Sequence, residues 1–454
     1  GFDVVIGNPP YGAEISKEQQ AYYLKSYTTP AYKLDTYAIF IEASMSIVKK
    51  QGSVGLIVPY TWLTISQHSK LRKFLFEFEI SEIVNLPNKV FSDADLDTVI
   101  LFVNDKQPNT KIKLSYSNGN IILSDEKFIN IENVKKNNDL LINLYLLEED
   151  LDIVEKIENK STLDSYFDVS QGYIPYRRSD LVKKYGKEEG NKIVDERLWH
   201  SDIKISESWR QEIQGKDISR YKNSESFQYI KYGKHLAGYV EERFFTEHRI
   251  SIMEVTRGDI YRLKATLLKK EYFNTPSLIN IIKKQEHAGS LNTLLAIINS
   301  RLMSWYHTKA HSKANAETSI PKILVKDLRS LPIIPEDKNL AQKADLMLSL
   351  NEQLQDLTGK FIRTLQRKFE IEKLSKKLEN WHELTYAEFI KELAKKKVKM
   401  SLSEEAEWEE YFLAEQAKAQ QLMLQIENTD KEIDQMVYKL YDLTDDEIAI
   451  IEAS

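Results

Sequence analysis

The sequence contains no cysteine and no long hydrophobic run. The lack of cysteine excludes a disulfide framework, a thiolate metal site and a cysteine nucleophile. No apolar run approaches the roughly 20 residues that cross a bilayer, and no signal peptide opens the chain. We therefore expect an intracellular, cytoplasmic protein that has no membrane partner. At 454 residues the chain is long enough for two to three domains.

Charge is distributed unevenly along the chain. Residues 1–160 hold 17 basic and 22 acidic side chains, residues 161–335 hold 29 and 21, and residues 336–454 hold 17 and 26. The net charge of −6 thus conceals a segment of +8 between two acidic flanks. Six of the eight histidines also lie in the basic segment. A basic middle of this kind is typical of a nucleic-acid-binding domain.

The first part of the chain alternates strand-like and helix-like patterns. Helices at about 35–50 and 67–77 separate the first three of four predicted strands, which lie at 3–8, 53–59, 80–86 and 98–104. This alternation predicts an α/β fold with a doubly wound parallel sheet. The first strand reads as buried, because its residues are mostly apolar. The last two strands have no helix between them, which predicts an antiparallel pair at the sheet edge.

Further elements follow this sheet. Residues 111–123 are predicted to form a hairpin turned by Asn118-Gly119, and residues 139–160 a Leu-rich, acidic helix. We expect four segments, namely 1–138, a helical spacer at 139–160, a mixed α+β segment at 161–335 and a helical region at 336–454.

The most informative motif is Asn8-Pro9-Pro10-Tyr11, directly after the first predicted strand. Open α/β sheets bind ligands beyond the carboxyl ends of their strands. Two prolines stiffen this loop and remove two backbone donors, which leaves carbonyl acceptors, one carboxamide and one aromatic ring. The alternative is a strand-ending turn, because proline and asparagine are ordinary turn residues.

This set of groups suits a planar substrate that carries an amino group. The lone pair of such a nitrogen is delocalised, so it is a poor nucleophile. The Asn8 side-chain oxygen and the Pro9 carbonyl could accept its two hydrogens and draw it toward tetrahedral geometry. Acceptors aimed at charge that develops in the transition state give large rate enhancements. The Tyr11 ring could stack on the substrate.

Residues 1–104 resemble the later part of the catalytic domain of adenine-specific DNA methyltransferases, in the TaqI-like branch of type II restriction–modification enzymes. The resemblance rests on the order of segments Asp3 to Tyr11, Asp35 to Glu42, Gly52 to Pro59, Leu71 to Leu75, Ile80 to Leu86, Val90-Phe91 and Thr98 to Phe102. It implies a Rossmann-like methyltransferase sheet of which this chain holds the later half.

The resemblance also implies roles for individual residues. Asn8, Pro9 and Pro10 match the cradle of the target amino group, while Tyr11 and Phe91 match the aromatic contacts to the target base. Phe40 matches an apolar residue that packs on the adenine ring of S-adenosylmethionine. Phe40 also lies at helical spacing with apolar neighbours and could simply belong to the core.

The parts that hold the cofactor in this family are missing. We find no Gly-rich strand–turn–helix fingerprint, and nothing precedes residue 8 that could hold one. We find no convincing nuclease motif either, because Asp152 with Glu158 and Lys160 lies in a helical pattern. We therefore expect a carboxyl-terminal portion that binds S-adenosylmethionine weakly or not at all by itself. A missing amino-terminal region or another chain is expected to complete the sheet.

The basic segment is predicted to recognise double-stranded DNA. Its sequence resembles the TaqI-like specificity domain at Gly215 to Tyr221, Arg249 to Arg257, Asn299 to Tyr306, Ile320 to Lys322 and Leu331 to Pro335. The loop with Tyr173, Tyr176, Arg177 and Arg178 combines aromatic and cationic side chains, so these four are candidate DNA contacts. For most other Lys and Arg residues, a solvated surface position is the better interpretation.

Two remaining features favour structural interpretations. His307 and His311 share a helical face, but without cysteine or a nearby carboxylate at ligand spacing we expect no metal. From about 339 onward, leucines recur at helical spacing, which predicts an amphipathic bundle or a coiled-coil arm. Thr444 and Glu447 form a predicted capping box.

Together these features predict methylation of the adenine amino group in duplex DNA within a type II restriction–modification protein. Whether that protein also cleaves DNA stays open at this point. In the implied mechanism the target adenine swings out of the stack. Two alternatives stay open. One is a protein-glutamine methyltransferase, and the other is a DNA-binding specificity module without catalysis.

Overall fold

A computed structural model of the chain describes residues 1–30, 34–86, 97–117, 122–136, 139–258, 260–286, 289–310 and 321–454. The chain divides into two compact units. The first combines Gly1–Glu155 with Trp305–Ile323, and the second combines Lys156–Ser304 with Leu324–Ser454. Most of the predicted mixed α+β segment therefore shares one unit with the predicted helical region.

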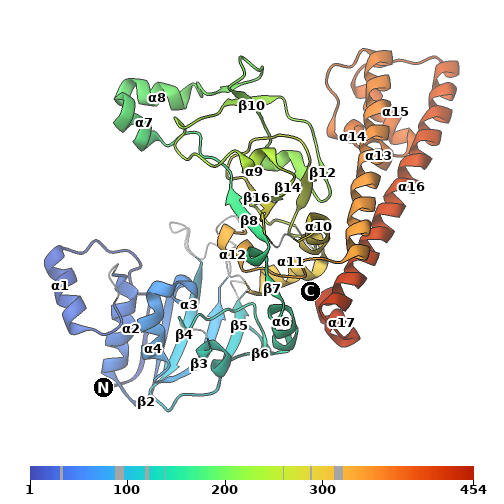
Figure 1. Cartoon of the computed structure of the whole chain (residues 1–454). Helices are drawn as coiled ribbons and strands as arrows, with labels where there is room; N and C mark the ends of the chain where they lie inside the picture. Colours follow the sequence, from blue (N-terminus) through green and yellow to red (C-terminus); the bar gives the residue numbers. More distant parts are fainter. Residues whose placement is uncertain are drawn as a thin grey trace. The chain divides into compact units, whose positions relative to one another are not determined.

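The first unit is built on a mixed six-stranded sheet (Figure 1). Its strands are β1 (Phe2–Gly7), β2 (Val48–Pro59), β3 (Glu79–Asn85), β4 (Thr98–Asn104), β5 (Lys111–Ser117) and β6 (Ile122–Asn130). They lie in the order β1-β2-β4-β3-β5-β6. The pairs β1–β2 and β3–β5 are parallel, and the remaining neighbours are antiparallel.

Helices cover one face of this sheet. The helical elements up to residue 158 are α1 (Lys17–Ser26), α2 (Thr36–Ile47), α3 (Thr61–Thr64), η1 (Ser66–His68), α4 (Ser69–Leu75), α5 (Ile131–Lys135), η2 (Glu148–Asp150) and α6 (Leu151–Glu158). Apolar residues of α2, α3 and α4 form one core with alternate residues of the strands, such as Val54, Leu56, Ile83 and Leu101. Helix α1 buries none of its residues.

The predicted strands and helices of this unit are present, but the place of β4 in the sheet differs from the prediction. The antiparallel pairing of β3 and β4 is confirmed, yet β4 lies between β2 and β3 and not at the edge. The reason is visible in its sequence. Val99, Leu101 and Val103 are buried, and β4 carries no charged residue of the kind that protects an edge strand.

Strand β1 is parallel to β2 as predicted, but it is not buried. Phe2, Val4 and Ile6 are 62%, 61% and 80% exposed. They alternate along the strand and so share one face, while Val5 packs against the core on the other. Among the described residues β1 pairs only with β2, and the high exposure of these three side chains shows that no described element covers this face of the strand.

The helix predicted at 139–160 is also shorter than expected. Regular helix begins only at η2 and continues as α6, so residues 139–147 precede it without helical structure. The side chain of Asn143 accepts a hydrogen bond from the Tyr145 N–H at 3.0 Å, which competes with a helical hydrogen bond. Ile142 and Leu144 are fully buried in the core.

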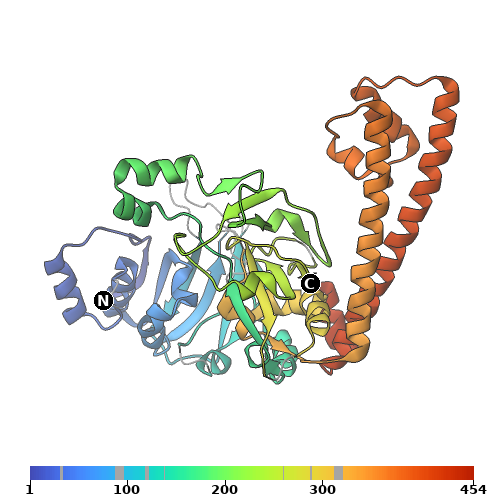
Figure 2. The same cartoon turned by 45° about the horizontal axis from the view of Figure 1, so that its top comes forward.

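The second unit begins with a mainly β region (Figure 2). Its largest sheet is antiparallel and has the order β15-β14-β16-β8. The members are β8 (Phe167–Gln171), β14 (Arg249–Met253), β15 (Ala265–Leu268) and β16 (Leu278–Lys283). A smaller, three-stranded sheet contains β9 (His200–Ser201), β10 (Trp209–Glu212) and β13 (Gln228–Lys231). Two further sheets have two strands each. One pairs β11 (Ile218–Ser219) with β12 (Lys222–Asn223), and the other pairs β7 (Ser161–Thr162) with β17 (Pro332–Ile333).

Helices complete this region. They are η3 (Leu163–Ser165), α7 (Arg178–Tyr185), α8 (Lys187–Asp195), η4 (Gly215–Asp217), α9 (Arg243–Thr246), α10 (Leu291–Asn299) and α12 (Val325–Arg329), while α11 (Arg301–Ala310) begins in the second unit and ends in the first. An aromatic-rich core, including Tyr173, Trp199, Tyr232, Phe245 and Phe273, lies beneath β13 and α9.

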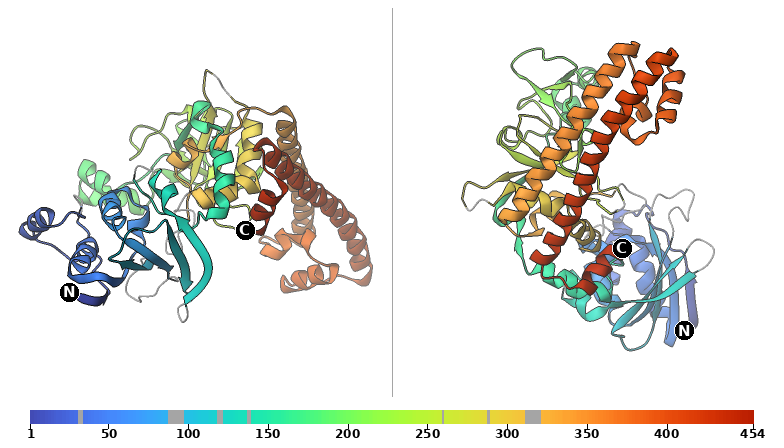
Figure 3. Two further views of the ribbon diagram at one scale, coloured as in Figure 1. Left: turned by 90° about the horizontal axis from the view of Figure 1, so that it is seen from below. Right: turned by 90° about the vertical axis from the view of Figure 1, so that its right-hand side faces the viewer.

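Two long helices dominate the rest of the second unit (Figure 3). Helices α13 (Lys338–Phe369) and α16 (Leu402–Leu440) pack along each other, and we call this pair the helical hairpin. The shorter elements α14 (Lys376–Glu379), η6 (Trp381–Glu383) and α15 (Tyr386–Lys395) share an aromatic core with it, where the Phe361 and Trp381 rings stack with centroids 3.7 Å apart. The last helix, α17 (Asp445–Ala453), has the predicted capping box of Thr444 and Glu447.

Candidate functional site

The Asn8-Pro9-Pro10-Tyr11 loop begins directly after β1, at the carboxyl end of this strand. The Tyr11 hydroxyl donates its one hydrogen to the Asn8 Oδ1 at 2.5 Å, and the carbonyl oxygen of Ile57, near the end of β2, lies 3.1 Å from the same hydroxyl oxygen. Asn8 is exposed, whereas the Tyr11 ring is half-buried against the core. Burial raises the pKa of the Tyr11 hydroxyl, so it remains a donor at neutral pH.

These contacts determine how Asn8 is oriented. An amide oxygen has two lone pairs, and Tyr11 uses one of them. Because Tyr11 holds Oδ1, the remaining lone pair has a defined direction at an exposed position. The loop therefore brings Asn8 and Tyr11 together, although Tyr11 lies closer to the core than a free stacking platform would.

The loop is also attached to the start of α2. The Thr36 hydroxyl donates to the Pro10 carbonyl at 2.5 Å. At the adjacent position, the Tyr37 hydroxyl lies 3.0 Å from His68 Nε2, and His68 lies 3.3 Å from a carboxylate oxygen of Asp35. Burial lowers the pKa of His68, which favours the neutral ring. The sequence interpretation did not assign a role to Thr36 or His68, because their partners are distant in sequence.

Phe40 and Phe91 are the two other aromatic residues to which the sequence analysis gave a role. Phe40 lies on α2 and is 47% exposed, so it is not a core residue of the described unit. Its ring is available to a planar partner. Phe91 lies outside the residues that the structure describes.

The aromatic residues predicted to contact DNA have unequal positions. Tyr173 is fully buried in the aromatic core and donates to the carboxylate of Glu212. This corrects the prediction for Tyr173, because a side chain without exposed surface does not reach DNA. Tyr176 is half-buried, and its ring stacks on Trp199 at a centroid distance of 5.2 Å.

The two predicted arginines lie at the surface. Arg177 precedes α7 and pairs with Asp180 at 2.9 Å, while Arg178 pairs with Asp195 at 2.6 Å. Both arginine side chains are about half exposed, at 52% and 51%. Exposed ion pairs contribute little to stability, so these pairs can open at low cost when a phosphate approaches.

Comparisons with known proteins match three parts of the chain. Residues 1–91 match the Eco57I restriction-modification methylase family. Residues 210–333 match the TaqI-like C-terminal specificity domain, and residues 334–437 match a domain of unknown function. The chain thus carries an Eco57I-like methylase region and a TaqI-like specificity domain. The resemblance inferred from the sequence is confirmed.

Individual relatives agree with these matches. A putative type II restriction enzyme and methyltransferase of Methanocaldococcus jannaschii is 27% identical over 80% of this chain and 30% of the relative. A type II methyltransferase of Thermus thermophilus is 35% identical over 22% of this chain and 25% of the relative. The chain therefore spans about a third or less of these relatives. Among solved structures, one similar to this chain is the type IIL restriction-modification enzyme MmeI in complex with DNA. The alignment covers 98% of this chain and 55% of the MmeI chain, with 11% sequence identity and a TM-score of 0.49.

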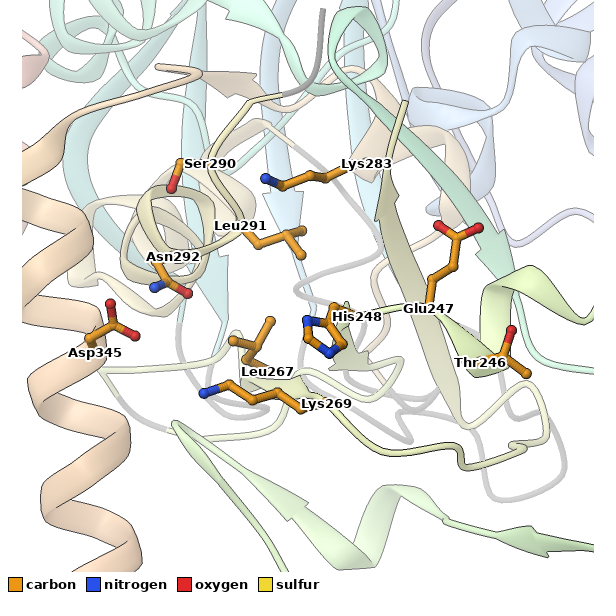
Figure 4. Close-up of a pocket in the computed structure, with 10 residues that line it drawn as sticks. All are labelled: Thr246, Glu247, His248, Leu267, Lys269, Lys283, Ser290, Leu291, Asn292 and Asp345. Atoms are coloured by element: carbon orange, nitrogen blue, oxygen red, sulfur yellow. The ribbon is translucent and has the colours of Figure 1, made fainter. Parts of the chain in front are cut away.

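One pocket of the second unit, about 600 Å³ in volume, lies beside the amino-terminal end of α10 (Figure 4). Ser290 is the N-cap of this helix, Lys269 reaches the pocket from the position directly after β15, and Lys283 from the end of β16. Glu247 and Asp345 add negative charge to the same lining. Because cations and carboxylates are mixed here, the lining does not favour one charge class of ligand.

A second pocket, about 740 Å³ in volume, lies in the same unit at the end of β10. Arg197 and Lys216 are exposed cations on its lining, and Tyr176, Gln214 and Ser277 contribute polar atoms. Glu212, which is fully buried, also belongs to the lining. The sequence analysis did not identify Glu212 or Gln214 as candidate site residues, because three separate strands bring their hydrogen-bond partners together.

Neither a metal cluster nor a membrane-spanning helix is found in the part of the chain that the structure describes. No group of three or more His, Asp or Glu residues there is arranged to hold a metal ion. None of the described helices is both long and apolar enough to cross a membrane. His311, one of the two histidines considered as a metal pair, lies outside the described residues.

The contact between α16 and the specificity domain contains a buried acid, Asp434, whose pKa is raised. Asp434 accepts hydrogen bonds from the Tyr261 hydroxyl at 2.7 Å and from the Arg301 N–H at 2.9 Å. Burial, with a further contribution from Asp430, raises the pKa of Asp434 to about 6. A raised pKa means that the folded state binds this proton more tightly than the unfolded chain. The associated stability is therefore present below the unfolded pKa and is lost as the pH rises through 6.

Replacing Asp434 with asparagine is expected to remove this loss. At pH 8 the free energy of unfolding is expected to rise by up to about 3 kcal/mol, because a shift of one pKa unit is worth roughly 1.4 kcal/mol. At pH 4 the variant gains nothing. Urea unfolding at both pH values measures the difference, with the exposed acid Glu410 on the same helix, changed to Gln, as the control. Equal stabilisation at both pH values would contradict this account.

Proposed function

We propose that this chain provides the target-base pocket and the DNA recognition of an enzyme that methylates the exocyclic amino group of adenine in duplex DNA. The observation that carries the proposal is the Asn8-Pro9-Pro10-Tyr11 loop at the carboxyl end of β1, with Asn8 exposed and held by Tyr11. It is supported by the match of the same residues to a methylase family and by the TaqI-like specificity domain. The enzyme would act within a type II restriction–modification protein.

The loop suits this chemistry because it supplies acceptors and no charge. Adenine extruded from the duplex presents two N–H groups, and we assign the second lone pair of Asn8 Oδ1 to one of them and the Pro9 carbonyl to the other. Acceptance of both hydrogens strengthens as the nitrogen gains positive charge in the transition state. Tyr11 and Phe91 would contact the base. Unstacking costs a few kcal/mol, and stacking on an aromatic side chain offsets about 1–3 kcal/mol of it.

S-adenosylmethionine is the methyl donor that this reaction requires, and the described residues fit one part of it. The half-exposed Phe40 ring on α2 would pack on the adenine ring of the donor. We assign no residue of this chain to the ribose or to the methionine portion. The chain by itself is accordingly expected to bind the donor weakly or not at all, which calorimetry with the 454-residue chain can measure.

The exposed face of β1 suits the partner that would hold the rest of the donor. Phe2, Val4 and Ile6 form an apolar row on a strand with one free edge. Edges and faces of this kind are normally covered by another segment. We propose that an amino-terminal region of the intact protein, or another chain, pairs with β1 and completes the methyltransferase sheet.

A substitution at Ile6 tests this proposal. In the 454-residue chain, Ile6→Lys is expected to change the free energy of unfolding by less than about 0.5 kcal/mol, because Ile6 is 80% exposed. In the intact protein the same change is expected to cost about 2–5 kcal/mol, as for loss of a buried aliphatic side chain. Denaturant unfolding of both forms measures this, with the exposed Leu424→Lys as control. An equally small effect in both forms would contradict the proposed pairing.

Two other functions remain as outcomes of a methylation assay. Labelled methyl transfer from S-adenosylmethionine to duplex DNA by the intact protein supports the proposal. Transfer to the side-chain amide of a glutamine in a protein would favour a protein-glutamine methyltransferase. Sequence-specific DNA binding without any transfer would leave a specificity module.

A further inference from the structure

The pocket at the end of β10 contains a carboxamide whose orientation is fixed by its neighbours. Gln214 Nε2 donates to Glu212 Oε1 at 2.8 Å and to Gln228 Oε1 at 3.0 Å. Both of its N–H groups are thereby used. A carboxylate can only accept, so the contact with Glu212 determines which end of the amide is nitrogen.

The carboxylate is itself held in place. The hydroxyl of Tyr173 donates to Glu212 Oε2, and His200 Nε2 lies 3.2 Å from the same oxygen. Burial raises the pKa of Glu212, but the hydrogen bonds from His200, Gln214 and Tyr173 outweigh it and lower the pKa below its usual value. The side chain is therefore ionised at neutral pH. Rotating the Gln214 amide would direct its oxygen at this carboxylate and lose both hydrogen bonds.

The opposite end of the amide, Oε1, is the acceptor that Gln214 keeps for a ligand. Gln214 lines it, and among the described residues no hydrogen bond reaches Gln214 Oε1. The exposed cations Arg197 and Lys216 lie on the same lining and form no ion pair with the rest of the described chain. The pocket thus combines one oriented acceptor with two cations that suit phosphates.

We propose that Gln214 is a specificity-determining residue that accepts a hydrogen bond from the exocyclic amino group of adenine or cytosine in the recognition sequence. This inference rests on the proposed DNA-recognition function. In the major groove adenine and cytosine present an amino donor, whereas guanine and thymine present a carbonyl oxygen. A glutamine that reads adenine alone also donates to N7. Here both N–H groups are engaged internally, so adenine and cytosine are both accepted and the two keto bases are rejected.

Selection from a randomised duplex DNA library by the 454-residue chain, followed by sequencing of the bound fraction, tests this assignment. The wild-type chain is expected to enrich one motif in which a single position takes adenine or cytosine over guanine or thymine by tenfold or more. Gln214→Met is expected to lose this preference at that position alone. Gln214→Arg replaces the acceptor with donors and is expected to shift the preference to guanine.

Gln211→Arg is the matched control, because Gln211 lies on β10 three residues before Gln214, donates to the Ser226 carbonyl and does not line the pocket. It is expected to keep the wild-type motif. An unchanged motif in both Gln214 variants overturns the inference and leaves the proposed function intact. If the wild-type chain enriches no motif, the proposed DNA recognition fails, and this inference with it. If thermal melting followed by circular dichroism shows that both Gln214 variants are unfolded, Gln214 has a structural role in the folded core, which also overturns the inference.

Discussion

Replacing Asn8 with alanine in the intact protein is expected to lower the rate of methyl transfer to DNA by a factor of about 100 or more, as for loss of one preorganised hydrogen-bonding group at a reacting centre. Asn8 is exposed, and its side chain accepts a hydrogen bond from Tyr11. The effect is therefore expected in the maximal rate, with DNA affinity changed by less than about threefold, because an interaction made in the transition state affects kcat.

Single-turnover assays with labelled S-adenosylmethionine separate the rate from the affinity. Asn428→Ala on the exposed side of α16 removes the same group far along the sequence and is expected to have no effect. Tyr11→Phe provides a second comparison. It keeps the ring but releases Asn8 Oδ1, so a partial loss of rate indicates that the Tyr11 hydroxyl orients the carboxamide. Methylation by Asn8→Ala at the wild-type rate would refute the catalytic role of the loop.

Replacing Arg220 with alanine is expected to destabilise the second unit by up to about 3–5 kcal/mol, the range for removing one partner of a buried ion pair, because the Arg220 and Asp430 side chains are only 18% and 14% exposed. The Arg220 guanidinium donates to both carboxylate oxygens of Asp430 at 2.7 and 2.5 Å and to the Asn299 carbonyl at 2.8 Å. It also lies 3.6 Å from the centroid of the Tyr261 ring. The substitution leaves the Asp430 carboxylate and the Asn299 carbonyl without these partners.

Arg220→Lys distinguishes charge from geometry. Lysine keeps the charge but cannot make the bidentate contact, so it is expected to recover less than half of the loss. Guanidinium unfolding followed by circular dichroism measures both variants, with Arg177→Ala in an exposed ion pair as the control. If Arg220→Ala lowers the free energy of unfolding by less than about 1 kcal/mol, the Arg220–Asp430 pair contributes no more than an exposed surface ion pair, which would contradict this prediction.

The local sequence predicted the elements of the methylase region well, because each element carries its own pattern. β4 is an apolar strand, and its pairing with β3 follows from the lack of a helix between them. Its position between β2 and β3 depends on pairing across the sheet, which short-range pattern does not encode. The same limit explains β1. An apolar strand reads as buried, yet its exposure depends on what lies beside it.

The candidate site was predicted where a rare motif carries the signal and missed where the signal lies in long-range contacts. Asn8 and Tyr11 adjoin in the loop and were found together. Tyr173 was misread, because its loop is rich in aromatic and basic residues while its hydroxyl meets Glu212, which lies 39 residues later. Gln214 resembles any polar loop residue until β9, β10 and β13 bring its partners around it.

The identity of the methylated atom tests the central claim most directly. Duplex DNA modified by the intact protein with labelled S-adenosylmethionine can be digested to nucleosides and separated by mass spectrometry. The account predicts that the label resides in N6-methyladenine, at one sequence context. Label in N4-methylcytosine or C5-methylcytosine, or no label in DNA at all, would contradict it.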